Sequence, residues 1–315
     1  MYAKFTLRLL LAFTLFIPLA AHAQRKPRII VVTHGQAVDP FWLIVKNGVQ
    51  IATKETDSDV DYRSPEKFDL HAMARLIDDA VASEPDGLVV TIPDAAALSK
   101  SIRAAVAAKI PVVSINSGLE ISRQLGCIMH IGQPEEAAGR KAGQRMKAMG
   151  VKEAIILDQE VGNVALQERI KGFQAGFEGP FHHVQVLMVK MNAAQCQELI
   201  RDYLQKNPAV DGVMALGPVA AEPALAAIAE LGKASQIKLC TFDVSPAIIA
   251  ALAKKQMEFA IDQQEWLQGY LPIVFLANYI RYGSIPQNDF IMTGPSVVTS
   301  ENAGKVVNLL SLGFH

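Results

Sequence analysis

The chain has 315 residues, a formal net charge of −1 and a hydrophobic fraction of 50%. This length suits two domains of ordinary size or one large domain, and the apolar fraction is sufficient for sizeable cores. The near-neutral charge gives no electrostatic reason to expect nucleic acid or an anionic lipid surface as a partner.

The first 23 residues have the pattern of a secretory signal peptide. Lys4 and Arg8 form a positive start, residues 9–19 are apolar, and residues 21–23 form a small-x-small cleavage site. The apolar stretch is too short to span a bilayer, and the alternative is a buried N-terminal helix. We expect a mature periplasmic chain that begins at Gln24, with a formal net charge of −3 because Lys4 and Arg8 are removed.

From residue 29 onward, strand and helix patterns alternate. The predicted strands are short apolar runs, and the predicted helices carry apolar residues three and four positions apart. The strands are expected at residues 29–32, 60–62, 87–91, 110–115, 127–131, 154–157, 184–189, 212–216, 237–242 and 259–262. The helices are expected from Asp39-Pro40, at 68–82, 95–108, 134–149, 163–177, 193–206 and 219–231, from Pro246, and at 266–282.

The alternation predicts parallel sheets with right-handed crossovers. A weak internal repeat suggests that the chain has two similar halves. In residues 85–90 and again in residues 210–215, Asp-Gly begins a predicted strand, which is followed by a helix and a second strand. That second strand ends at Asn116 in one half and at Asp243 in the other. The expected fold class is therefore α/β, with two similar doubly wound parallel-sheet domains.

Catalytic and cofactor motifs are absent from the sequence. It contains no Gly-x-Ser-x-Gly elbow, no Gly-x4-Gly-Lys phosphate loop and no Gly-x-Gly-x-x-Gly turn after a strand. Its histidines lack metal-ligand spacing, and Cys127, Cys196 and Cys240 lie in or beside apolar segments, as buried free thiols do. We therefore expect no cofactor, no metal, no disulfide framework and no enzyme.

A set of polar and aromatic residues follows the predicted strand ends, where ligands bind in open α/β sheets. The set comprises Asp39, Phe41, Trp42, Asn116, Asp243 and Gln263, with Arg169 on a nearby helix. Such a mix suits a sugar, whose hydroxyls need directed donors and acceptors and whose C–H faces need flat aromatic surface. The structural alternatives are a surface ion pair for Arg169, a loop cap for Asp243 and a turn for Asn116. For the aromatics, the alternative is that Phe41 packs on the sheet and Trp42 covers a neighbouring loop, since adjacent helix positions point about 100° apart and the two rings are not expected to face one core. The spacing leaves open whether Gln263 or Gln264 faces inward.

In these stretches the chain resembles the periplasmic sugar-binding proteins of the ribose-binding type, the soluble receptors of ABC importers. The resemblance covers nearly all of the mature chain. It rests on residues 39–42 (Asp-Pro-Phe-Trp), 110–116, 168–173 (Glu-Arg-Ile-Lys-Gly-Phe), 241–243 (Thr-Phe-Asp) and 260–264, in this order. It implies that the ligand-binding residues are Asp39, Phe41, Trp42, Asn116, Arg169, Phe242, Asp243 and Gln263.

Two positions depart from the ribose-binding pattern. Ser117 stands where those proteins carry Arg, and Gly217-Pro218 stands where they carry Asn-Asp. The missing side chains suggest a ligand larger than ribose, or differently hydroxylated. Substitutes are expected among nearby polar residues, of which His34 and Asn163 are our main candidates; the others are Gln36, Gln133, Glu160 and Asn192.

The resemblance also implies two lobes joined by three hinge segments, near residues 132–134, 262–264 and 293–295. We expect one lobe from residues 24–132 and 264–293, and the other from residues 133–263 and 294–315. The expected function is capture of a sugar, polyol or cyclitol by a monomer that docks on an ABC permease. Alternatives are a chemotaxis or signalling receptor, a transcriptional regulator and a secreted hydrolase using Asp39 and Asp243.

Overall fold

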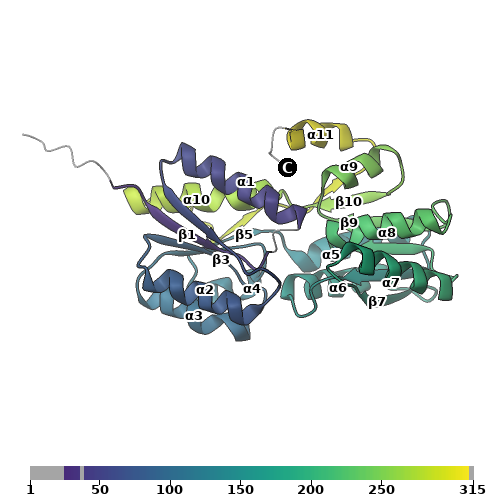
Figure 1. Cartoon of the computed structure of the whole chain (residues 1–315), viewed down its shortest axis with the longest axis horizontal. Coiled ribbons are helices and arrows are strands. Elements are labelled where there is room, and N and C mark those ends of the chain that lie inside the picture. The colour runs from purple at the N-terminus through teal and green to yellow at the C-terminus, as the bar shows by residue number, and fades with distance from the viewer. Residues whose placement is uncertain (1–24, 36–38, 312–315) are drawn as a thin grey trace, which may run out of the picture.

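The computed structural model describes residues 25–35 and 39–311, and they form two α/β lobes, each built on its own six-stranded sheet (Figure 1). The predicted signal peptide and Gln36 lie outside the described residues. We call the half that contains β1 the first lobe and the half that contains β6 the second lobe. The two sheets and their helices follow the predicted alternation closely.

The sheet of the first lobe is entirely parallel and has the strand order β11-β5-β4-β3-β1-β2. Its central strands are buried on both faces, because helices cover both sides. Helices α1 and α10 cover one face, and α2 and α3 cover the other. The bounds are β1 (Arg28–Val32), α1 (Pro40–Glu55), β2 (Asp59–Arg63), α2 (Leu70–Ala82), β3 (Gly87–Thr91), α3 (Ala95–Ala107), β4 (Val112–Ile115), α4 (Leu119–Ser122), a 3-10 turn (Arg123–Leu125), β5 (Met129–Gly132), α10 (Glu265–Tyr282) and β11 (Phe290–Met292).

The sheet of the second lobe repeats this plan in the order β12-β10-β9-β8-β6-β7. Helices α5 and α6 cover one face, and α7, α8, α9 and α11 cover the other. The bounds are α5 (Glu135–Ala148), β6 (Glu153–Asp158), α6 (Val164–Phe177), β7 (His183–Met188), α7 (Ala193–Lys206), β8 (Gly212–Ala215), α8 (Pro218–Glu230), β9 (Lys238–Phe242), α9 (Pro246–Ala253), β10 (Phe259–Asp262), β12 (Ser296–Val298) and α11 (Ala303–Ser311).

One strand corrects the all-parallel prediction, because β12 pairs with β10 in the antiparallel direction. Neither β11 nor β12 was predicted, since each has only three residues. The chain leaves the second lobe at the end of β10 and returns to it at the start of β12, so the end of β10 lies beside the start of β12, with Asp262 opposite Ser296. The chain therefore runs back along β10.

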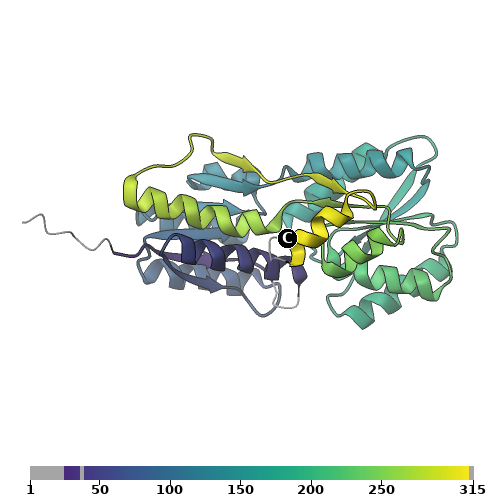
Figure 2. The same cartoon turned by 90° about the horizontal axis from the view of Figure 1, so that it is seen from above.

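The chain passes between the lobes three times, after β5, after β10 and after β11. Figure 2 shows α10 alongside α1 and the last passage, from β11 to β12, leading from one lobe to the other. The passages are tied together, because the Thr293 backbone N–H donates to the Gly132 carbonyl at 2.7 Å and the Gln264 amide donates to the Thr293 carbonyl.

Glycines let α5 and α6 approach at backbone contact. A Cβ atom at Gly139 would lie 2.1 Å from the carbonyl oxygen of Arg169, and one at Gly172 would lie 2.0 Å from the carbonyl oxygen of Glu136. Any larger residue would push the helices apart. This approach places the N-terminus of α5 beside the middle of α6, and so positions the side chains described next.

The cysteines are free and buried, as expected. Within residues 25–35 and 39–311, no helix combines the length and the apolar character needed to cross a bilayer.

Candidate functional site

A pocket with an empty volume of about 350 Å³ lies between the lobes, where strand ends from both sheets meet. Nine of the ten predicted site residues line it. From the first lobe come His34, Asp39, Phe41, Trp42 and Asn116, and from the second come Asn163, Arg169, Asp243 and Gln263. Gln159, Glu160, Ala165, Leu166, Leu216, Gly217 and Pro218 complete the lining.

The aromatic wall of the pocket is built by the start of α1. Asp39 is the N-cap and accepts a hydrogen bond from the Phe41 backbone N–H at 3.0 Å, and Pro40 occupies the first helical position. Phe41 and Trp42 are 4% and 3% exposed, so both contact the core as well as the pocket. The expectation that the two adjacent rings cannot share one core is therefore wrong, because both belong to the same hydrophobic cluster and both line the pocket.

Edge-to-face contacts fix the orientation of Trp42. Its ring centroid lies 4.8 Å from that of Phe41 and 4.9 Å from that of His34. A Cβ atom at Gly35 would lie 2.1 Å from the indole, so only glycine lets the backbone after β1 pass this close to the ring. The indole is therefore held before any ligand arrives.

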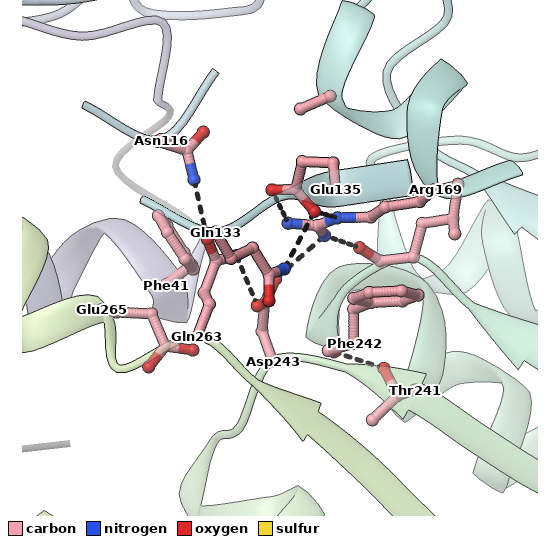
Figure 3. A network of polar contacts seen from close by, with 12 residues as sticks. Phe41, Asn116, Gln133, Glu135, Arg169, Thr241, Phe242, Asp243, Gln263 and Glu265 are labelled. Carbon is pink, nitrogen blue, oxygen red and sulfur yellow. Dashed lines mark hydrogen bonds and ion pairs between the residues drawn. The ribbon is translucent and has the colours of Figure 1, made fainter. Parts of the chain in front are cut away.

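Arg169 forms the charged wall, and its guanidinium is held on three sides (Figure 3). Nε and Nη2 donate to the two carboxylate oxygens of Glu135 at 2.7 and 3.0 Å, and Nη1 donates to the Leu216 carbonyl at 2.9 Å and to Asp243 Oδ2 at 3.4 Å. The guanidinium carbon lies 4.5 Å from the ring centroid of Phe242. Burial disfavours the charge of Arg169, but the charges of Glu135 and Asp243 outweigh burial and raise its pKa further.

Asn116 and Asp243 occupy equivalent places at the ends of β4 and β9. Both have φ of +62°, the left-handed region that Asn and Asp tolerate best among residues with a side chain. Gln263 connects them across the lobes, because its amide donates to Asp243 Oδ1 at 2.6 Å and its carbonyl oxygen accepts from Asn116 at 3.3 Å. Gln264 turns away to Thr293, so Gln263 is the glutamine that faces the pocket.

His34 and Asn163 form a second connection between the lobes. Asn163 Oδ1 accepts from the Ala165 backbone N–H at 3.1 Å, which leaves its Nδ2 to donate to Glu160 at 2.9 Å and to His34 Nε2 at 3.2 Å. His34 Nδ1 then donates to Thr91 at 2.8 Å. Burial lowers the pKa of His34 to about 3, so the ring is neutral and its 3.6 Å contact with Glu160 is not an ion pair.

Comparison with known proteins identifies the family to which this architecture belongs. A family model described as a periplasmic binding protein domain matches residues 29–284. The chain belongs to the periplasmic binding protein family. The ribose-binding resemblance of the sequence and the two-lobed α/β fold are thereby confirmed.

Individual relatives of this binding protein agree with the family match. A carbohydrate transporter from Acidothermus cellulolyticus, solved with myo-inositol, is 32% identical, with a TM-score of 0.86 over 92% of this chain and all of that one. The xylose/arabinose-binding protein XylF of Sulfolobus acidocaldarius is 25% identical over 87% of this chain and 71% of its own length. The D-ribose/D-allose-binding protein of Pseudomonas aeruginosa is 24% identical over 81% and 83%. These relatives are named as binding or transport proteins and not as enzymes.

Three buried carboxyl groups in the pocket have raised pKa values. Burial raises the pKa of Glu160 to about 8, with the charges of Asp39 and Asp158 adding to the effect and the Asn163 hydrogen bond opposing it. Burial also raises the pKa of Asp39 to about 6, against the Phe41 hydrogen bond. Burial likewise raises the pKa of Asp243, although Arg169 acts in the opposite direction. The pocket of this binding protein therefore holds more acidic groups than its one arginine neutralises.

Some expected residues lie elsewhere in the binding protein. Phe242 is fully buried beneath Arg169 and supports the guanidinium instead of lining the pocket. Asn192 is exposed and caps α7, while Gln133 donates to Glu135 behind the arginine. Glu160, one of the suggested substitutes, does line the pocket.

Two residues that line or support the pocket were missed from the sequence. Gln159 lines the pocket directly after β6. Its position at the carboxyl end of a predicted strand, next to Asp158, could have identified it. Glu135, 3% exposed, fixes Arg169, and no local pattern indicated that pairing. The surface ion pair considered for Arg169 is replaced by a buried one. Within the part of the chain that the structure describes, no cluster of three or more His, Cys, Asp or Glu residues is arranged to hold a metal ion.

Proposed function

We propose that this protein captures a sugar, polyol or cyclitol in the periplasm and delivers it to the permease of an ABC importer. The observation that carries the proposal is the pocket between the lobes, with an aromatic wall, amides and carboxyl groups, and an immobilised guanidinium. Such a ring of directed donors and acceptors around flat apolar surface matches a polyhydroxylated ring. Relatives solved or named with pentoses, D-allose and myo-inositol support this ligand class.

Each wall has its own role in the proposed complex. Trp42 and Phe41 would cover the C–H face of the ring, and Asn116, Asn163 and Gln263 would meet hydroxyls from the two sides. Arg169 would donate to a ring or hydroxyl oxygen, and it needs no reorganisation because Glu135 already fixes it. Binding requires no covalent chemistry.

The lobes we propose are residues 24–132 with 264–293 and residues 133–263 with 294–315, joined by the three passages near 132–134, 262–264 and 293–295. The Val164 backbone N–H donates to the Pro93 carbonyl at 2.9 Å and Ser117 donates to Asn163 at 3.2 Å, so the lobes touch at the rim of the pocket. A ligand that contacts both lobes stabilises this closed arrangement by its differential affinity for it. The closed form would then be the one that docks on the permease.

The test is a thermal-shift screen of the chain from Gln24 onward against sugars, polyols and cyclitols. A ligand that binds only the native state raises Tm in proportion to the logarithm of its concentration over Kd. We expect at least one clear stabilising ligand. Trp42→Ala should weaken its binding about tenfold to a hundredfold, the usual cost of losing a stacking aromatic of about 1–3 kcal/mol.

Leu43→Ala is the matched control, because Leu43 is the next residue of α1 and is 51% exposed. It should leave the affinity unchanged. A screen in which no carbohydrate, polyol or cyclitol shifts Tm would contradict the proposed ligand class. Equal affinity of the wild type and Trp42→Ala would instead show that Trp42 does not contribute to ligand binding.

A further inference from the structure

Acidic side chains outnumber basic side chains among the residues that line the pocket. Arg169 is the one cationic side chain among the described lining residues, and the acidic ones are Asp39, Glu160 and Asp243. Arg169 already forms ion pairs with Asp243 and with Glu135 behind it. His34 is neutral and contributes no positive charge. Asp39 and Glu160 are therefore left without a cationic partner.

Both carboxyl groups also keep an oxygen available to a ligand. Asp39 is 8% exposed, and its Oδ1 accepts from the Phe41 backbone while its Oδ2 accepts from no described residue. Glu160 is 7% exposed, and its Oε2 accepts from Asn163 while its Oε1 has no donor among the described residues. Both oxygens can therefore accept from a donor that a ligand brings, and such a hydrogen bond would stabilise the complex.

The two groups come from different lobes. Asp39 caps α1 in the first lobe, and Glu160 follows β6 in the second. Burial, helped by the charge of Asp39, raises the pKa of Glu160 to about 8, so Glu160 holds a proton at pH 7 while no cation lies between the two groups. A positive group between them would favour the charged form of both acids and hold the lobes together by its attraction to each.

We propose that the ligand carries an ammonium group in addition to hydroxyls, as an amino sugar or an amino cyclitol does, and that Asp39 and Glu160 bind this group from opposite lobes. This inference rests on the proposed function and specifies its ligand class. A neutral ligand would offer only hydroxyl donors to two buried acids, whereas an ammonium group forms charge-assisted hydrogen bonds with both, which are roughly twice as strong. Arg169, held by Glu135, stays available for a ring or hydroxyl oxygen.

The experiment measures Kd by titration calorimetry for matched pairs that differ by one amino group: D-glucosamine with D-glucose, D-galactosamine with D-galactose, and an amino-deoxy-inositol with myo-inositol. The measurements are made at pH 7 with the chain from Gln24 onward. We expect the amine of at least one pair to bind about tenfold to a hundredfold tighter than its hydroxyl partner, the usual contribution of a hydrogen bond to a charged group.

Three variants locate the preference. Glu160→Gln keeps the shape of the side chain, and Asp39→Asn keeps a good N-cap, so each removes mainly the ability to form a carboxylate beside the ligand's amine. Each should reduce the amine-over-hydroxyl affinity ratio by about tenfold. Glu301→Gln is the control, because Glu301 is exposed in the turn before α11 and does not line the pocket. It should leave the affinity ratio unchanged.

The outcomes separate this inference from the function on which it rests. Tight binding of a neutral sugar, polyol or cyclitol with no gain from the amine would overturn the inference and leave the proposed function standing. An amine preference that persists in both Glu160→Gln and Asp39→Asn would also overturn it, because other residues would then bind the ammonium group. Failure of every compound to bind would contradict the proposed function itself.

Discussion

The two lobes share one scaffold but contribute different chemistry to the pocket. The first lobe presents mostly neutral groups: Phe41, Trp42, Asn116 and the neutral ring of His34. The second lobe presents the arginine and most of the acidic groups, with Glu135 behind them. The common fold thus determines where side chains from the two lobes meet. The first lobe supplies the aromatic rings for stacking, and the second supplies most of the charged groups.

The lobes also hold their walls in place by different means. Phe41 and Trp42 are extensions of a hydrophobic core, so packing positions them. Arg169 is held by an ion pair and by hydrogen bonds that are satisfied only in the complete second lobe. The charged wall should therefore be more sensitive than the aromatic wall to the loss of a single partner.

The largest effect is expected from Arg169→Met. It leaves Glu135 buried without its cation, and breaking one side of a buried ion pair typically costs about 3–5 kcal/mol. Urea unfolding should show this loss, and ligand binding should fall with it. Lys171→Met is the matched control, because Lys171 lies on the same helix in a solvent-exposed pair with Glu136, and such pairs contribute little to stability.

The double variant Arg169→Met with Glu135→Gln separates charge from packing. Without the buried charge, most of the lost stability should return while ligand affinity stays low. A double variant as unstable as Arg169→Met alone would contradict the role given to Glu135.

A smaller but clear effect is expected from Gly139→Ala. The added Cβ would meet the backbone of Arg169 at 2.1 Å, and backbone cannot rotate away, so α5 and α6 must separate. We expect about 1–3 kcal/mol of destabilisation, as overpacking usually gives, together with weaker ligand binding. Gly304→Ala, in α11 with open space around it, should be neutral or slightly stabilising.

Gly35→Ala tests the aromatic wall in the same way. Here the added Cβ meets the indole of Trp42, a side chain that has some freedom to shift, so the loss of stability should be smaller than for Gly139→Ala. Ligand affinity and tryptophan fluorescence should both change. In a Trp42→Ala background the same substitution should have little effect on affinity, since the partner of the clash is gone.

The last effect concerns pH and the ligand-free protein. The pKa of Glu160 rises from 4.5 to about 8 on folding, so the folded state binds more protons between these values. Its contribution to stability is fully present below about pH 4.5 and is lost as the pH rises toward 8. Tm of the wild type should therefore fall more steeply from pH 5 to pH 8 than Tm of Glu160→Gln, while Glu301→Gln follows the wild type.

Much of this protein follows from its sequence alone. Apolar periodicity predicted nearly all long helices and strands, and Asp39-Pro40 predicted the start of α1. Both predictions succeeded because helix caps and amphipathic faces depend on residues close together in the sequence. Strand ends that carry Asn116 and Asp243 indicated the two sides of the pocket, since carboxyl ends of parallel strands gather at one edge of a sheet.

Tertiary structure alone decided the rest. The pairing of Glu135 with Arg169 joins residues from two helices, and its geometry depends on glycines that permit backbone contact. The choice of Gln263 over Gln264 depends on Thr293 in a distant passage, and the antiparallel β12 depends on where the last passage enters the sheet. Long-range contacts of this kind leave no periodic trace in a sequence, because each is set by packing between segments and not by the spacing within one.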